Sequence, residues 1–470
     1  MFFHQRFVPG LAIASYLVGD EKARQVAVID PTRDVDEYIQ IAKDEGLHIT
    51  HILETHVHAD YVSGSAELKA RLGGEPQVVV SGMGGKAWTP PYADQVVQDG
   101  DEVRLGGIRL KAIHTPGHTP EHVAWALFDD TRSNDTPWLL FTGDLLFVGD
   151  VGRPDLLGPD EQKALAHQLY RTLFEKVAAV PDFTEVFPAH GSGSLCGKAI
   201  GSRRSSTFGF ERRFNRSLQP APEAEWTATL LQDMPLAPPY FKRMKQVNAA
   251  GPAILGPTLP GQRRLSAREL HERICADCLV VDVRPKEAYA TAHIPGSINI
   301  PLGENLPSWA GWVLPYDKRL VIVPSRPDEM PEVVTHLIRV GLDQVEGYLD
   351  DGMDAWQNQG FEISQLGSIS VQALASRLAG AEGEKPFVLD VRTESEWSAG
   401  HIDGALHVHG GLLRDRYREV PRDRPIAVVC GTGYRGSIAA SFLKSQGYEN
   451  VSNVLGGMSA WKGAGLPMAR

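Results

Sequence analysis

Six side chains of the types that bind metal ions stand near the ends of strand-like segments in the first half of the chain. The segment GLHITHILET leads into HVHAD, IRLKAI into HTPGH, WLLFT into GD, and EVFP into AH. Strand ends in an α/β sheet converge on one rim, so side chains far apart in the sequence can meet there. The sequence therefore predicts a metal centre at this rim, with the candidate ligands His56, His58, Asp60, His118, Asp144 and His190. Three nearby histidines are interpreted as ordinary polar residues, namely His51, His114 and His122.

A second group of reactive side chains lies near the end of the chain. The segment PIAVVCGTGYRGSIAASFLKSQGY runs from a buried strand through Cys430 and a glycine loop into a helix. A thiol with backbone N–H groups curling around it and a helix N-terminus behind it is stabilised as a thiolate or persulfide anion. Arg435 adds positive charge on the far side of this loop and can bind sulfite or thiosulfate.

The same loop also matches the GxGxxG pattern of dinucleotide-binding folds, with Glu449 about twenty residues further on. In that fold the acidic residue ends the next strand, whereas Glu449 precedes the segment NVSNVL. The loop also lies in the second copy of a repeated unit whose first copy lacks these glycines. Both observations disfavour nucleotide binding.

The elements that must position these groups indicate an α/β protein of several domains. Residues 1–247 alternate β-branched runs with helical patterns, and residues 248–264 are rich in glycine and proline and are predicted to be a linker. Beyond the linker the chain repeats itself, since a strand ending in Asp-Val-Arg, a helix and a His-Ile-x-Gly motif occur twice. We expect two like domains with parallel sheets at 265–360 and 366–470.

Composition limits the classes of function. The chain has 470 residues and a formal net charge of −11. This net negative charge argues against general nucleic-acid binding, which needs a dense basic surface. No stretch approaches the roughly 18 apolar residues of a spanning helix, so we expect a cytoplasmic protein without membrane contact. Four cysteines cannot form a disulfide framework in so long a chain.

The metal-ligand motifs carry a family resemblance. The order His-x-His-x-Asp, Pro-Gly-His, Thr-Gly-Asp and Pro-Ala-His resembles the metallo-β-lactamase superfamily, which implies an αβ/βα sandwich for residues 1–247. Within it, THVHADYVSGS, TPGHTP, FTGDLLFVGDVGRPD and FPAHGSGS resemble the persulfide dioxygenases, also called sulfur dioxygenases.

This resemblance implies one Fe(II) per chain, held by His56, His118 and Asp144. Two imidazoles and one carboxylate on one face leave coordination positions open, an arrangement suited to non-haem iron that must hold substrate and O2 together. The neighbouring groups would then orient the ligands and a bound water. These are His58, Asp60, Tyr61 and His190.

The sequence is compatible with two alternatives. Dinuclear zinc thioester hydrolases of the glyoxalase II type use a histidine directly after the aspartate, where this chain has Tyr61, so the second metal is in doubt. The other alternative is a non-catalytic, sulfide-sensing scaffold. Retention of Cys430 and Arg435 counts against it, since a pure scaffold needs neither.

Two residues near the predicted metal rim have candidate roles. Arg153, in GDVGRPD, can hold an anionic substrate through its forked donors or form a surface salt bridge. Cys196, in the small-residue loop HGSGSLCGKAIGS, is expected to take or relay a sulfane sulfur, or else to be a buried inert thiol. Some persulfide dioxygenases fused to rhodanese domains carry a cysteine in a similar loop, which favours the functional interpretation.

The second group of motifs resembles the rhodaneses. Their Cys-x-x-Gly-x-Arg loop matches the stretch from Cys430 to Arg435, and the Asp-Val-Arg and His-Ile-x-Gly-Ala elements match as well. The resemblance implies that Cys430 carries sulfur as a nucleophile and that the loop binds the substrate. The loop residues are Gly431, Thr432, Gly433 and Tyr434. The first copy has Pro324 and Glu329 at the places of Cys430 and Arg435, so we expect it to be inactive.

The whole chain thus resembles a persulfide dioxygenase fused to tandem rhodanese domains. Such a protein would oxidise a low-molecular-weight thiol persulfide with O2 to sulfite, and its sulfurtransferase domain would form or use thiosulfate in sulfide detoxification. Coupling two sites in one chain raises the effective concentration of a shared intermediate. The resemblance also implies a homo-oligomer, either a dimer or a tetramer.

Overall fold

The computed structural model describes residues 1–275, 278–381 and 383–470. These residues form two compact units. The first unit is Met1–Thr258 with Ile338–Gly341, and the second is Leu259–Leu337 with Leu342–Arg470.

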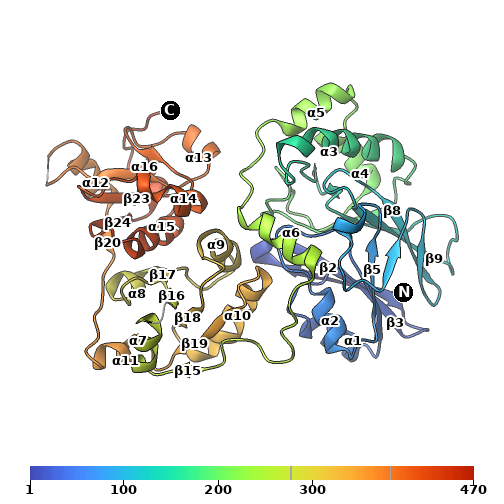
Figure 1. The fold of residues 1–470 in the computed structure, drawn as a ribbon. Helices are drawn as coiled ribbons and strands as arrows, with labels where there is room; N and C mark the ends of the chain where they lie inside the picture. Colours follow the sequence, from blue (N-terminus) through green and yellow to red (C-terminus); the bar gives the residue numbers. More distant parts are fainter. Residues whose placement is uncertain (276–277, 382) are drawn as a thin grey trace. The chain divides into compact units, whose positions relative to one another are not determined.

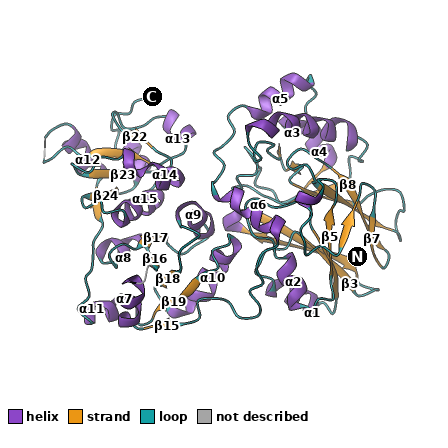
Figure 2. Cartoon of the chain, in the orientation of Figure 1, coloured by secondary structure: helices purple, strands orange, loops and turns teal. Residues whose placement is uncertain are grey.

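The first unit is built on two six-stranded sheets (Figures 1 and 2). The first sheet has the order β1(Phe2–Val8), β2(Ile13–Asp20), β3(Gln25–Ile29), β4(His48–Leu53), β5(Gln77–Ser81) and β6(Gln95–Val97). The second has the order β14(Ser206–Thr207), β13(Glu185–Pro188), β10(Leu139–Gly143), β9(Val123–Asp129), β8(Ile108–His114) and β7(Glu102–Leu105). A short hairpin of β11(Leu146–Phe147) and β12(Asp150–Val151) follows β10.

The core of this unit lies between the two sheets and beneath the helices that cover them. One apolar cluster joins strands of both sheets, including Tyr16 of β2 and Trp125 of β9. Separate clusters pack α1(Asp36–Asp44) and α2(Ser65–Arg71) on the first sheet, and α3(Pro159–Arg171) and α5(Glu223–Leu231) on the second. Since each sheet is covered on both faces, its central strands are apolar throughout, as in the fully buried strand VAWALFD. The predicted αβ/βα sandwich is confirmed.

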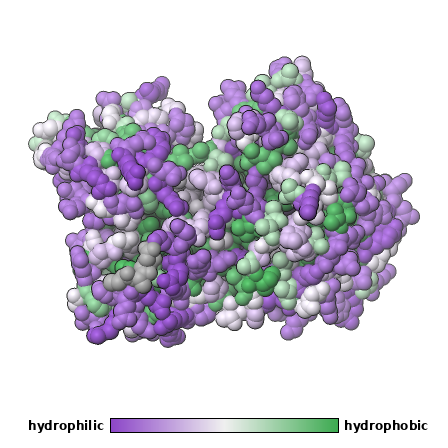
Figure 3. All heavy atoms as spheres, in the orientation of Figure 1, coloured by the Kyte–Doolittle hydropathy of each residue, from purple (hydrophilic) through white to green (hydrophobic). Residues whose placement is uncertain are grey.

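The described part of the first unit has two further α-helices. They are α4(Phe208–Phe214) and α6(Tyr240–Ala250). The second of these runs three residues into the segment 248–264, for which the sequence predicts a linker. Within the described part of the chain, no helix is long and apolar enough to cross a membrane. Hydrophilic residues cover most of the face seen in Figure 3.

The second unit contains two five-stranded sheets of the same topology. The first is β15(Arg264–Leu265), β19(Val345–Leu349), β18(Leu320–Val323), β16(Leu279–Asp282) and β17(Ile298–Asn299). The second is β20(Gly367–Ile369), β24(Val451–Val454), β23(Ile426–Val429), β21(Phe387–Asp390) and β22(Leu406–His407). All strand pairs in both sheets are parallel, which confirms the prediction of repeated α/β domains with parallel sheets.

Helices connect these parallel strands, as crossovers in a parallel sheet require, and one further helix follows the last strand of each sheet. In the first copy they are α7(Ala267–Cys275), α8(Lys286–Thr291), α9(Leu306–Val313), α10(Met330–Arg339) and α11(Gly352–Asn358). In the second copy they are α12(Val371–Leu378), α13(Glu394–Ser398), α14(Leu413–Arg416), α15(Tyr434–Ser445) and α16(Gly457–Gly463).

Substitution of Trp125 tests how much the core between the two sheets stabilises the first unit. Its side chain is fully buried, and its indole N–H donates to the backbone oxygen of Glu54 at 3.2 Å. We expect Trp125→Ala to lower the free energy of unfolding of the first unit by about 3–5 kcal/mol, because it removes a large buried side chain. Thermal or urea unfolding of the variant measures this loss. Trp138→Ala, which changes a partly buried tryptophan beside the same core, is the control and should cost clearly less.

Candidate functional site

Two histidines and one aspartate of the first unit converge on a single point. His56 follows β4, His118 follows β8 and Asp144 follows β10, and one ligand atom from each lies within 4.8 Å of the others. The Nε2 atom of His118 is 3.3 Å from Asp144 Oδ2, and that of His56 is 3.9 Å from the same oxygen. All three side chains are buried.

The atoms that face this point have no hydrogen-bond partner among the described residues. They are both Nε2 atoms and both carboxylate oxygens of Asp144. Buried polar atoms are almost always hydrogen-bonded. Imidazole nitrogens and carboxylate oxygens that converge without such partners therefore fit the ligand atoms of a bound metal ion. The other ring nitrogens are engaged, since His118 Nδ1 lies 2.8 Å from the backbone oxygen of Arg153 and His56 Nδ1 lies 2.9 Å from the Thr55 hydroxyl. These bonds orient the rings so that Nε2 points at the centre.

Asp60, His190 and Cys196 form a second cluster beside the first. Their ligand atoms also lie within 4.8 Å of one another. His190 Nε2 is 3.5 Å from Asp60 Oδ2 and 3.4 Å from Asp144 Oδ1, so Asp144 stands between the two clusters. Burial, together with the carboxylates of Asp60 and Asp144, raises the pKa of the Cys196 thiol well above its usual value. Cys196 is therefore a neutral thiol in the metal-free protein.

His58 forms a third cluster with Asp30 and Glu54, and Tyr61 also contacts Asp30. His58 Nε2 lies 3.2 Å from carboxylate oxygens of both Asp30 and Glu54. Burial lowers the pKa of His58, but these two carboxylates outweigh that effect and raise it well above its usual value. The Tyr61 hydroxyl donates to the backbone oxygen of Asp30 at 3.3 Å. Both side chains thus support the loop that carries His56.

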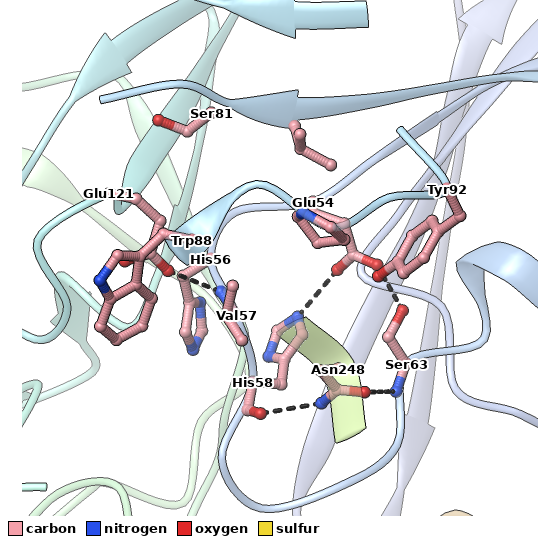
Figure 4. A pocket seen from close by; sticks show the side chains of 12 residues that line it. Glu54, His56, Val57, His58, Ser63, Ser81, Trp88, Tyr92, Glu121 and Asn248 are labelled. Atoms are coloured by element: carbon pink, nitrogen blue, oxygen red, sulfur yellow. Dashed lines mark hydrogen bonds and ion pairs between the residues drawn. The ribbon is translucent and has the colours of Figure 1, made fainter. Parts of the chain in front are cut away.

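Three residues around this loop were not found from the sequence. Asn248 of α6 donates to the backbone oxygens of His58 and Tyr61, each at 2.8 Å, and accepts from the N–H of Ser63. Glu54 and Glu121 line the pocket beside His56, as Figure 4 shows. No metal-binding motif includes these three residues as ligands, so the sequence did not identify them. Asn248 also lies 190 positions from His58.

Glu121 is a buried acid of this pocket. It accepts the N–H of Val57 at 2.7 Å, and burial raises its pKa to about 7. His122, which is expected from the sequence to be an ordinary polar residue, accepts the backbone N–H of Asp144 at 3.0 Å. It therefore supports a candidate ligand directly.

Arg153 is 1% exposed, and its guanidinium is engaged by neighbouring groups. It donates two bonds of 2.7 Å to Asp155 and others to the backbone oxygens of Leu195 and Pro235. These bonds explain its burial as an internal ion pair. Its role in holding substrate stays a prediction.

In the second unit, Cys430 lies at the end of β23 with its side chain buried. The N–H of Gly433 donates to Cys430 Sγ at 3.1 Å. Gly433 has a φ of 102°, a left-handed conformation that glycine adopts without strain, and it precedes the first turn of α15. The N–H of Met458 holds the Cys430 oxygen at 2.7 Å from the other side. The loop therefore has the geometry that favours a sulfur anion.

The corresponding loop of the first copy is organised around a carboxylate. Glu329 Oε2 accepts the N–H groups of Ser325 and Arg326, at 3.0 and 3.4 Å. Pro324 occupies the place of the nucleophile at the end of β18 and has no thiol. The carboxylate of Glu329 thus occupies backbone N–H groups of this loop that could otherwise bind an anion. This supports the expectation that the first copy is inactive.

Comparison with known proteins agrees with both folds. Residues 8–190 match the metallo-beta-lactamase superfamily, and residues 266–359 and 370–464 match the rhodanese-like domain. The mitochondrial persulfide dioxygenase ETHE1 of Bos taurus is 31% identical over 44% of this chain and 74% of its own length. A hydroxyacylglutathione hydrolase of Chromohalobacter salexigens is 35% identical over 37% of this chain and 60% of its own length. The crystal structure of a metallo-beta-lactamase from Staphylococcus aureus subsp. aureus COL is 35% identical, with a TM-score of 0.66, and covers 74% of this chain and 98% of that one.

The fold and the cluster of histidines and aspartates define a metallo-β-lactamase-type protein with a candidate metal centre. The chain belongs to the metallo-β-lactamase superfamily, within the group of persulfide dioxygenase homologues that is fused here to two rhodanese-like domains.

His118 tests the candidate metal centre. We expect His118→Ala to reduce the metal content of the purified protein at least tenfold, since it removes one of three ligands. His114→Ala is the matched control, because the Nε2 atom of this half-buried histidine lies 2.8 Å from the backbone oxygen of Pro120 and the residue is not in the cluster of candidate ligands. Elemental analysis of both variants gives the answer. Full metal content in His118→Ala would contradict the assignment.

Proposed function

We propose that the first unit is a non-haem iron persulfide dioxygenase that oxidises a low-molecular-weight thiol persulfide to sulfite. The observation that carries this proposal is the convergence of the unpartnered atoms of His56, His118 and Asp144. An Fe(II) bound to this trio would keep coordination positions open for a sulfur ligand and O2, and would supply the redox chemistry that zinc lacks.

The protein's own residues would hold and shield that centre. Thr55 and the backbone of Arg153 orient the two imidazoles, and His122 fixes the backbone of Asp144. Burial of the trio excludes bulk water, which strengthens the electrostatic interactions in the site. His58, Asp60, Tyr61 and His190 would act around the ligands. Cys196 as a sulfur relay and Arg153 as a substrate residue remain predictions.

We further propose that the second rhodanese-like domain transfers sulfane sulfur through Cys430. The thiolate would attack a sulfane sulfur of the donor, the donor's thiol or sulfite would leave with the electron pair of the broken S–S bond, and Cys430 would carry the persulfide. Transfer from Cys430 to sulfite would form thiosulfate, and the reverse transfer would use it. Arg435 would bind the anionic partner.

A dinuclear thioester hydrolase is the second candidate. The cluster of Asp60, His190 and Cys196 beside Asp144 favours it, because these groups offer a second set of ligand atoms. The chain is also similar to hydroxyacylglutathione hydrolases. Against it, Tyr61 occupies the position of a histidine ligand and bonds to the backbone of Asp30 instead.

Oxygen uptake separates these two functions. We expect protein reconstituted anaerobically with iron to consume dissolved O2 when glutathione persulfide is added and to produce sulfite. Zinc-loaded protein should leave the O2 untouched. An oxygen electrode combined with a thioester hydrolysis assay measures both activities. Hydrolysis by zinc-loaded protein, without O2 uptake by the iron form, would establish the hydrolase instead.

Cys430 tests the sulfur-transfer step. We expect Cys430→Ser to abolish thiosulfate–cyanide sulfurtransferase activity, because no other described residue of this loop offers a thiol. Cys278→Ser, which changes a buried thiol of the first copy, should keep the activity of the parent. Activity is followed as thiocyanate formed. If Cys430→Ser retains parental activity, the role assigned to Cys430 is wrong.

A further inference from the structure

The guanidinium of Arg435 is bound by a carboxylate of its own domain. Arg435 Nη1 donates to Glu396 Oε2 at 2.6 Å, and Nη2 donates to Glu396 Oε1 at 2.7 Å. This bidentate pair occupies the terminal fork of the guanidinium. Arg435 lies in the first turn of α15, directly after the Cys430 loop, whereas Glu396 lies in α13, so the pair joins two separate elements of the domain.

The Nη2 atom of Arg435, which is bound to Glu396, also lies beside the Cys430 loop. A Cβ placed on Gly431 would lie 3.0 Å from Arg435 Nη2 and 3.6 Å from Glu396 Oε1. The Nη2 edge and the carboxylate therefore both lie against the residue that follows Cys430. Among the described residues, Arg435 Nε donates to none, so this second fork is free for an anion.

The charges around Arg435 nearly cancel. Burial would raise the pKa of Glu396, but the hydrogen bonds from Arg435 and from the N–H of Thr393 outweigh it and lower that pKa to about 2. Burial and the charge of Arg435 lower the pKa of His409 to about 4, so this imidazole is neutral near pH 7. The carboxylate of Asp390 also acts on Arg435 through its charge and is itself paired with Arg392. An arriving anion thus meets an arginine whose charge is already balanced by Glu396.

The first copy has lost both members of this pair. Alignment on the Asp-Val-Arg motif places Ala288 at the position of Glu396, and Glu329 stands at the position of Arg435. The copy that keeps Cys430 keeps the pair, and the copy without the thiol has neither charge in place. This coincidence connects Glu396 with the chemistry at Cys430 and not only with the fold of α13.

We propose that Glu396 is the positioning residue of the anion site at Cys430, and that its charge limits how strongly this site attracts anions. It holds one fork of Arg435 so that the other fork faces the loop, and it balances the arginine's charge. Bound sulfite or thiosulfate can then leave again after sulfur transfer. The proposal rests on the proposed function for the part that concerns these substrates.

A purely structural role for Glu396 is the rival explanation. Glu396 also forms a capping box with Thr393 at the start of α13, in which its Oε2 accepts the N–H of Thr393 at 3.1 Å. Two control variants separate the roles. Thr393→Val removes the hydroxyl of the cap, including its bond to Glu396 Oε2 at 2.9 Å, but keeps the charge of Glu396 that pairs with Arg435. Glu394→Gln removes an exposed charge two positions away.

The test is the pH dependence of alkylation of Cys430 in the full chain, followed by mass spectrometry of the Cys430 peptide after treatment with iodoacetamide. Glu396→Gln keeps the size of the side chain and removes its charge. We expect its half-maximal alkylation to move down by about half a pH unit or more, because less negative charge opposes the thiolate. Thr393→Val and Glu394→Gln should keep the profile of the parent.

Sulfurtransferase kinetics provide the second measurement. We expect Glu396→Gln to lower the KM for thiosulfate by about threefold or more while kcat stays level or falls, since the anion is held more strongly. An unchanged or upward-shifted alkylation profile in Glu396→Gln would overturn the proposal, as would an equal shift in Thr393→Val. If alkylation shifts as expected but no variant or parent transfers sulfur, the proposed function fails and the role of Glu396 in charge balance stands.

Discussion

The first unit depends on one electrostatic constraint, which is that the Nε2 atoms of His56 and His118 and the carboxylate of Asp144 meet in a buried space. Without a cation these atoms have no hydrogen-bond partner among the described residues. Leaving such groups unpaired is costly, and a bound metal ion removes that cost. A metal ion held by these three side chains would therefore stabilise the surrounding structure and couple metal binding to folding.

The elements around this centre are arranged to hold its ligands at strand ends. Asn248 of α6 bonds to the backbone of the loop that carries His56, and His122 holds the backbone of Asp144. Gly152 packs so closely against Asp144 that a Cβ at this position would lie 1.8 Å from the backbone oxygen of Asp144. In the second unit, a glycine loop and the pair of Arg435 and Glu396 similarly surround Cys430. Both sites are built from short loops on rigid sheets, as sites in α/β proteins commonly are.

Much of the fold and of the site could be predicted from the sequence. The alternation of strands and helices and the repeated Asp-Val-Arg motif predicted the two kinds of α/β domain. The position of six candidate ligands at strand ends predicted a metal centre at one rim, and the family resemblance selected His56, His118 and Asp144 among them. The supporting residues could not be predicted in the same way. Asn248 and Glu396 act through contacts distant in sequence, and no local pattern identifies them. Burial could not be predicted from the sequence either. The sequence allows Arg153 to bind an anionic substrate, but in the structure its side chain is buried and paired with Asp155.

The most direct test of the central claim is iron K-edge X-ray absorption of the iron-loaded protein. The account predicts one iron environment with nitrogen and oxygen ligands from His56, His118 and Asp144, without a sulfur ligand from the protein. A protein sulfur at about 2.3 Å from the iron, or a second metal at about 3.5–4 Å, would contradict it, since either would draw Cys196 or the neighbouring cluster into the coordination of the metal.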